Sequence, residues 1–258
     1  MSKLTDTFAK GKTFAAFLTG GDPDLETTER LIPAMAEAGA DIIEIGIPFS
    51  DPIAEGPVIQ AASERALQAG CTVDKLFALV RRVRQITQIP LVFMTYANPI
   101  FAYGTDRFLK TCRDVGIDGI IVPDVPFEER EELAVFCRTY GVDQIAMVAP
   151  TSQARAAEIA RATEGFLYCV SSLGVTGMRS HLGHEISQVI QAAKGARDIP
   201  CAIGFGIRTP AQARDMAQLG DGVIVGSAIV DLIARHGADS AGPVCDYIRS
   251  IKAAISDS

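Results

Sequence analysis

The sequence predicts an α/β protein built as one closed (β/α)8 barrel, the TIM-barrel architecture, with extra helices and a single domain over residues 1–258. Short apolar segments alternate with amphipathic helical segments about every 25 to 40 residues, a pattern typical of βαβ units and a parallel sheet. Eight strand candidates are each followed by a helical pattern, whereas open doubly wound sheets more often have about five to seven strands. No linker, low-complexity stretch or charge run divides the chain.

The first half of the chain contains four of these strand candidates. We expect strands at residues 13–18, 42–47, 90–96 and 119–123. The helical periodicity predicts helices at residues 25–37, 58–69, 73–86, 105–115 and 128–140. The helix at 73–86 is additional to the barrel repeat, and residues 97–101 are expected to form a loop.

The second half continues the alternation. We expect strands at residues 144–149, 166–171, 200–204 and 222–225. Helices are predicted at 153–162, after each of the last two strands, and at 242–255. A long loop, residues 172–183, follows the sixth strand, and its glycines and serines suit a lid that closes over a ligand.

Composition narrows the range of functions. A hydrophobic content of 48% with 21% charged residues is ordinary for a soluble enzyme. The net charge of −7 disfavours nucleic acid or an anionic membrane as the main partner. No apolar run reaches the roughly 18 residues that span a bilayer, and the first residues lack the apolar core of a signal peptide, so we expect a cytoplasmic protein. The six cysteines form no C-x-x-C pair and are typical of reduced core thiols.

Glu44 is the leading candidate for acid–base chemistry. In the strand that contains it, Ile42, Glu44 and Gly46 share one face, and three isoleucines occupy the other. The loop that follows carries a second acid, Glu55. Acids at the end of a strand suit proton transfer, because burial raises the pKa of a carboxyl toward neutrality. The alternative is a structural acid satisfied by a nearby cation or donor.

Small residues in the last three strand-to-helix loops indicate a phosphate site. These loops contain Gly174–Gly177, Gly204–Gly206 and Gly226–Ser227, and backbone N–H groups there can approach an anion closely. Barrels commonly bind phosphate with their seventh and eighth loops. The alternative is that these glycines simply end strands. The residues alone therefore predict a small phosphorylated substrate beside one or two acids, as in barrel lyases, isomerases and aldolases.

Two other chemistries find little support in the sequence. A Schiff-base aldolase needs a lysine at a strand end, and the lysines fall in predicted helices or before the first strand. No cofactor or metal motif appears, so we expect no metal site.

The run Glu44-Ile45-Gly46-Ile47-Pro48-Phe49-Ser50-Asp51-Pro52, with Ala54, Gly56-Pro57 and Gln60, closely resembles the α subunit family of tryptophan synthase. The likeness recurs along nearly the whole chain. It implies retro-aldol cleavage of indole-3-glycerol phosphate to indole and D-glyceraldehyde 3-phosphate in L-tryptophan biosynthesis. One departure stands out, because the family usually has an aspartate where this chain has Glu55.

The resemblance also implies roles for individual residues. Glu44 would be the general acid and base, and Glu55 would hydrogen-bond the indole N–H. Thr176 would help to place Glu55. Residues matching the phosphate positions are Gly177, Gly206, Gly226 and Ser227. Residues around the indole and glycerol parts are Phe17, Met94, Tyr96, Asp124, Tyr168 and Phe205.

A partner is implied as well. Members of the family work with a pyridoxal-phosphate β subunit in an α2β2 heterotetramer, and this chain itself would carry no cofactor. Residues 48–57 and 98–101 would face the partner, since both segments carry apolar side chains beside polar ones. Three alternatives stay open: a relative that releases indole without a partner, another phosphate-binding barrel such as a sugar-phosphate isomerase, and a non-catalytic binding module.

Overall fold

The strands of the computed structural model run parallel in one sheet whose order is β5-β4-β3-β2-β1-β9-β8-β7-β6. The structure describes residues 2–170, 179–204 and 206–256. Within these ranges the strands are β1 (Thr13–Thr19), β2 (Ile42–Gly46), β3 (Leu91–Met94), β4 (Gly119–Ile121), β5 (Asp143–Ile145), β6 (Met147–Val148), β7 (Leu167–Val170), β8 (Cys201–Gly204) and β9 (Gly222–Val225).

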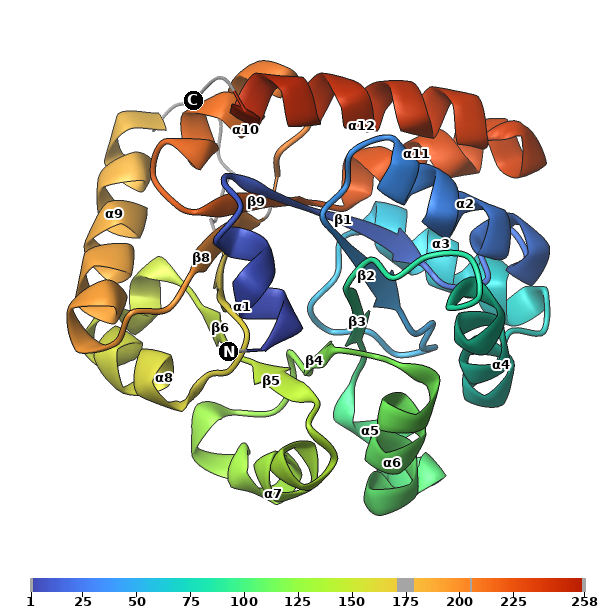
Figure 1. Cartoon of the computed structure of the whole chain (residues 1–258), viewed down its shortest axis with the longest axis horizontal. Helices are drawn as coiled ribbons and strands as arrows, with labels where there is room; N and C mark the ends of the chain where they lie inside the picture. Colours follow the sequence, from blue (N-terminus) through green and yellow to red (C-terminus); the bar gives the residue numbers. More distant parts are fainter. Residues whose placement is uncertain (1, 171–178, 205, 257–258) are drawn as a thin grey trace.

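Most of the helices surround this sheet on its outer side (Figure 1). In the described ranges the α-helices are α1 (Lys3–Phe8), α2 (Leu25–Glu37), α3 (Pro57–Gln68), α4 (Val73–Val83), α5 (Ala97–Tyr103), α6 (Thr105–Val115), α7 (Glu131–Tyr140), α8 (Ala156–Ala162), α9 (Arg179–Ala196), α10 (Pro210–Ala217), α11 (Ser227–His236) and α12 (Ala241–Ser256). The 3-10 helices are η1 (Phe127–Glu129), η2 (Pro150–Arg155) and η3 (Gly237–Asp239). Several helices begin at side-chain caps, with Asp24, Thr72 and Thr209 accepting backbone N–H groups in the first turn.

The sheet closes on itself through a single broken strand. Its two terminal strands, β5 and β6, follow one another along the chain with only Ala146 between them. β5 pairs with β4, while β6 pairs with β7, and the N–H of Tyr168 donates to the carbonyl of Ala146 at 3.0 Å. Counted as one, β5 and β6 are the fifth of eight strands, so the predicted (β/α)8 barrel is confirmed.

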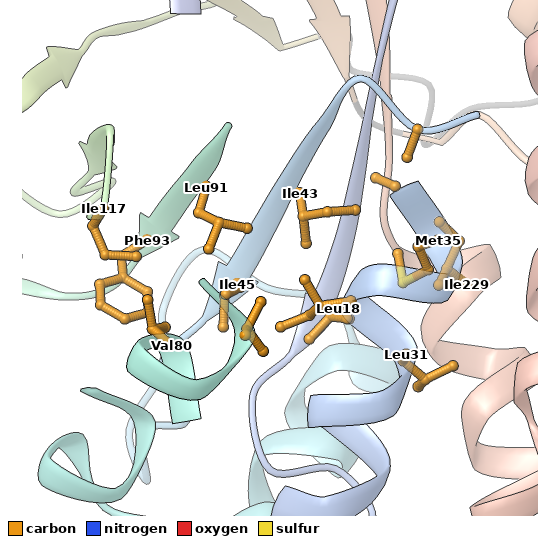
Figure 2. Close-up of a cluster of buried hydrophobic side chains, with 14 of the residues drawn as sticks. Leu18, Leu31, Met35, Ile43, Ile45, Val80, Leu91, Phe93, Ile117 and Ile229 are labelled. Carbon is orange, nitrogen blue, oxygen red and sulfur yellow. The ribbon is translucent and has the colours of Figure 1, made fainter. Parts of the chain in front are cut away.

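Alternation along each strand separates two cores. Outward residues meet the helices, as Figure 2 shows for Leu18, Ile43 and Phe93 among others between the strands and α2 and α4. Inward residues form a second cluster inside the barrel, which includes Ala15, Ile42, Val92, Ile121, Ile145 and Ile224. Because Ile42 points inward, period two also turns Glu44 inward, as the sequence predicts.

Helix α1 closes the amino-terminal end of the barrel and lies across the middle of the ring in Figure 1. Leu4 and Phe8 join the inner cluster, and the rings of Phe8 and Phe166 lie 5.3 Å apart. Since all strands are parallel, their carboxyl ends meet at the opposite mouth, which is left for a functional site.

The structure differs from the predicted local structure in several places. The short helix α1 was not predicted, and residues 97–101 belong to helix α5 rather than to a loop. The predicted helices at 128–140 and 153–162 begin as the 3-10 helices η1 and η2. Helix α9 begins at Arg179, inside the predicted loop 172–183, whose residues 172–178 lie outside the described ranges. No helix in the described ranges is long and apolar enough to cross a membrane.

Candidate active site at the carboxyl ends of the strands

Glu44 lies on β2 between Phe17 of β1 and Val92 of β3, its register partners on the neighbouring strands. The side chain is only 2% exposed, and no hydrogen-bond partner for its Oε1 atom occurs among the described residues. Burial raises the pKa of this carboxyl to about 8. Glu44 is therefore largely protonated at neutral pH, which suits a general acid.

Tyr168 on β7 shares this interior with Glu44. Burial raises the pKa of its phenol well above the usual value, and the charge of Glu44 raises it further, which places the two side chains near each other. Its ring lies against Gly204 of β8, where an added Cβ would come within 2.5 Å of the tyrosine Oη. A larger residue at position 204 would therefore displace the ring.

Phe17 occupies the same mouth from β1. Its ring lies between Gly46 and Gly226, where added Cβ atoms would come within 2.7 and 3.2 Å of ring carbons. Phe17 also packs with Ala62 of α3 and Val230 of α11. The glycines at 46 and 226 thus make room for an aromatic ring.

Glu55 lies in the loop between β2 and α3, and its Oε2 atom is buried without a hydrogen-bond partner among the described residues. Burial raises the pKa of the Glu55 carboxyl, and a hydrogen bond from the Tyr96 hydroxyl opposes that rise. The Tyr96 oxygen accepts the N–H of Ala54 at 3.0 Å, and the Tyr96 ring lies 5.3 Å from that of Phe49. Tyr96 thereby ties the loop that carries Glu55 to the end of β3.

Asp124 follows β4, and its carboxylate accepts hydrogen bonds from another part of the chain. Both of its carboxylate oxygens accept the N–H of Ala97, the first residue of α5, at 3.0 and 3.2 Å. Its charge contributes to raising the pKa of Tyr96, which places it beside that ring. In this structure the Asp124 carboxylate satisfies the first N–H group of α5, directly after Tyr96.

The predicted phosphate residues divide into two groups. Gly206 has a φ of +78°, in the region that favours glycine, and Gly226 and Ser227 begin α11 directly after β9. Within the described part of the chain, no acceptor is found for the N–H groups of Ser227 and Ala228, so the start of α11 can donate to an anion. Thr176, Gly177 and Phe205 lie outside the described residues.

Sequence reasoning missed several polar residues close to this mouth. Thr19 lies on the same face of β1 as Phe17, and its buried hydroxyl has no partner among the described residues. Asp22, in the next loop, is buried and paired with Arg65 of α3. The alternation of β1 predicts the orientation of Thr19, but a buried hydroxyl without a partner is visible only in three dimensions.

A cavity of about 120 Å³ borders the site. It lies at the carboxyl ends of β4 and β5–β6, and Glu44 and Tyr168 are not among its lining residues. The residues that line it are Val122, Pro123, Val125, Phe127, Arg130, Gln144, Ile145, Ala146 and Met147. Met147 pairs in register with Tyr168, so the cavity adjoins the interior that holds Glu44 without containing the acid.

In the described residues, no group of three or more His, Cys, Asp or Glu side chains is placed to hold a metal ion. The apolar side chains of the two predicted partner-facing segments differ in exposure. Ile53 and Phe101 are 80% and 50% exposed, whereas Phe49 is half-buried and Ile100 is buried.

Known proteins are similar to this chain in sequence and in fold. A family model described as tryptophan synthase alpha chain matches residues 4–253. The tryptophan synthase alpha chain of Lacticaseibacillus casei is 45% identical, covering 99% of this chain and 96% of the relative. That of Alkaliphilus metalliredigens is 50% identical, covering 86% and 84%. Among solved structures, tryptophan synthase subunit alpha from Legionella pneumophila has a TM-score of 0.91 at 34% identity, covering 100% of both chains.

Proposed function

The chain belongs to the tryptophan synthase alpha chain family, and on that premise we propose which of its residues carry out the family's reaction. The chain is a carbon–carbon lyase of tryptophan biosynthesis that cleaves indole-3-glycerol phosphate to indole and glyceraldehyde 3-phosphate. It carries no cofactor itself, and pyridoxal phosphate belongs to the β chain with which it assembles.

Glu44 is the general acid and base of the proposal. The indole ring must gain a proton at C3 before the bond from C3 to the glycerol chain breaks, and the protonated Glu44 supplies it. As that bond breaks, its electron pair returns to the ring, and the glycerol hydroxyl gives its proton to the Glu44 carboxylate as the aldehyde forms. The observation that carries this assignment is the buried carboxyl whose pKa lies near 8.

Glu55 accepts a hydrogen bond from the indole N–H and stabilises the positive charge that develops on the protonated ring. Two observations support this role: the Oε2 atom of Glu55 has no partner among the described residues, and the Tyr96 hydroxyl lies beside the same carboxyl and influences its pKa. Glutamate is one methylene longer than the family's aspartate.

The remaining residues bind the substrate. Backbone N–H groups at Gly206, Gly226 and Ser227 hold the phosphate, supported by the start of α11 described above. Phe17, Tyr96, Asp124 and Tyr168 surround the indole and glycerol parts. Thr176, Gly177 and Phe205, outside the described residues, belong to the proposal through the family resemblance alone.

The β chain would contact segments 48–57 and 98–101, where Ile53 and Phe101 present apolar surface to solvent. We place the resulting α2β2 complex in the cytoplasm. The six cysteines are all buried free thiols, as expected in a reducing compartment.

Replacing Glu44 by Gln tests the assignment, because Gln is nearly isosteric but cannot transfer the proton. Indole release from indole-3-glycerol phosphate should fall by at least about 10³-fold with substrate binding largely kept. Glu64→Gln, the same change on the exposed surface of α3, should leave turnover unchanged. Turnover of the Glu44→Gln variant within about tenfold of the wild type would remove Glu44 from the chemistry.

A further inference from the structure

We propose that Asp22 and Arg65 are positioning residues for the cleavage reaction, because their ion pair fixes helix α3 over the barrel mouth. Glu55 lies in the loop directly before Gly56, the cap of α3, and Ala62 of α3 packs on Phe17. The inference deepens the proposed function and rests on the roles given there to Glu44 and Glu55.

The ion pair has the geometry of a rigid fork. Arg65 Nε donates to Asp22 Oδ1 and Arg65 Nη2 donates to Asp22 Oδ2, both at 2.8 Å. The Asp22 residue is 1% exposed, so loss of the guanidinium would leave a buried carboxylate without this ion-pair partner. Two parallel hydrogen bonds fix orientation as well as distance, which a single contact from lysine does not.

Helix α3 connects Arg65, near its carboxyl-terminal end, to the segment that contains Glu55. The helix is capped by Gly56 and begins at Pro57, two residues after Glu55. The side chain of Gln60, in the first turn, donates to the backbone carbonyl of Glu55 at 2.8 Å. The main chain of Glu55 therefore moves with the first turn of α3.

The buried positions of α3 are small residues, namely Ala62, Ser63 and Ala66, while Val58 and Ile59 of its first turn pack partly buried against the cluster around Phe17. Ala62 packs on Phe17, and Gly21 lies close to Ala66 and Cys71. A Cβ at Gly21, whose φ is +84°, would come within 2.7 Å of the Cys71 sulfur and 3.6 Å of the Ala66 Cβ. Small residues permit close contact but provide few interlocking side chains against sliding.

The two hydrogen bonds between Arg65 and Asp22 restrain the position of α3 beside these small residues. Arg65 lies three residues after Ala62 and directly before Ala66, so it projects beside the same face. Displacement of a reacting group by about 1 Å is enough to reduce turnover about 10²-fold. We therefore expect the ion pair to act on the rate of cleavage more than on phosphate binding, which takes place at the start of α11.

A second fork in the molecule serves as a matched control. Arg82 of α4 holds Glu29 of α2 through three hydrogen bonds of 2.6 to 2.9 Å. It joins two outer helices, and neither residue is near the residues proposed for catalysis. Arg→Lys changes at 65 and 82 thus remove the same kind of fork in two places.

The test measures indole release from indole-3-glycerol phosphate, the dissociation constant of glycerol 3-phosphate, and Tm for the full chain. Arg65→Lys and Asp22→Asn should each lower kcat at least tenfold, with the glycerol 3-phosphate dissociation constant within twofold of the wild type. Arg82→Lys should keep kcat within twofold. Ile248→Val, a core change on α12, shows how much kcat falls for a given loss of Tm.

Two outcomes overturn the inference. If Arg65→Lys keeps kcat within twofold while Glu44→Gln is inactive, the proposed function stands and the positioning role fails. If Ile248→Val loses as much kcat as Arg65→Lys at equal Tm, the ion pair acts only through stability. An active Glu44→Gln variant would instead contradict the proposed function itself.

Discussion

At the scale of single residues, the site is organised around an acid that weakens the fold. Glu44 is buried between two strands, and no hydrogen-bond partner for Oε1 is found in the described residues. A group whose pKa is raised in the folded protein keeps its proton there while the unfolded chain loses it. Folding stability therefore falls as the pH rises from about 4.5, the unfolded value, to about 8. The same burial that prepares the acid for proton donation reduces stability at neutral pH.

Glu44→Gln should therefore stabilise the protein while abolishing its activity. The neutral side chain removes the unfavourable charge, so the free energy of unfolding should rise by roughly 2 to 4 kcal/mol at pH 8.5 and change little at pH 5. Urea denaturation at the two pH values measures both figures. Glu64→Gln serves as the control, and an equal effect of Glu44→Gln at both pH values would show that the carboxyl titrates normally.

At the scale of elements, helix α1 acts as the floor of the barrel. Leu4 is fully buried, and its side chain lies close to Gly119 and Gly165, where added Cβ atoms would meet it at 2.8 and 3.1 Å. Thr5 donates from its hydroxyl to the carbonyl of Gly165 at 2.8 Å. The helix has only six residues, too few to be stable alone, so its stability comes from docking on the barrel.

Leu4→Ala should destabilise the protein without altering catalysis. Removing a fully buried leucine side chain costs about 2 to 5 kcal/mol, and the site lies at the opposite end of the barrel. Denaturant unfolding and indole release measure the two effects, with the exposed Lys10→Ala as control. A loss below about 0.5 kcal/mol would mean that α1 contributes little to the core, and a large change in kcat would mean that the two ends are coupled.

At the scale of the whole molecule, aspartates at the starts of the strands join neighbouring strands. Asp41, Asp118 and Asp221 each accept the first or second N–H of an adjacent strand, and each pairs with a cation, namely Lys252, Arg84 and Lys194. All three follow a glycine by one or two residues. Their hydrogen bonds and ion pairs link neighbouring strands, and the helices that carry the cations, at the amino-terminal rim of the barrel.

Asp143 occupies the equivalent place on β5 without these partners. Its Oδ2 atom is buried and has no hydrogen-bond partner among the described residues. Burial raises the pKa of this carboxyl to about 6, the charges of Glu164 and Asp118 add to the rise, and Ser2 and Arg197 oppose it. The same residue type therefore has opposite effects at two points of one rim.

Asparagine substitutions at the two positions should have opposite effects. Asp143→Asn should raise the free energy of unfolding by about 1 kcal/mol at pH 8, after discounting for partial exposure, and by almost nothing at pH 4. Asp118→Asn should lower it by about 1 to 3 kcal/mol at pH 8, since Arg84 and the N–H of Leu91 lose an ionised acceptor. Urea titrations of both variants measure this, and destabilisation by both would show that Asp143 also stabilises the rim as an anion.

Much of the site could be predicted from local pattern. The two-residue period of residues 42–47 turns Glu44 into the barrel, and the glycines at 206 and 226 mark the loops beside α11. The role of Asp124 could not be predicted, because its carboxylate accepts the N–H of Ala97. Asp124 follows β4, whereas Ala97 follows β3, so the two residues meet only in the folded barrel. The pairing of Asp22 with Arg65 joins residues 43 positions apart and leaves no local pattern.

The sequence by itself determined the alternation of strands and helices, the number of strands and the face on which each side chain lies, because these follow from periodicity along a short stretch of chain. Only the tertiary structure decided that the sheet closes through Ala146, that α1 fills one end of the barrel, and that the Oε1 atom of Glu44 is buried without a hydrogen-bond partner among the described residues. These outcomes depend on which distant residues share a space, and burial and charge pairing are properties of that shared space.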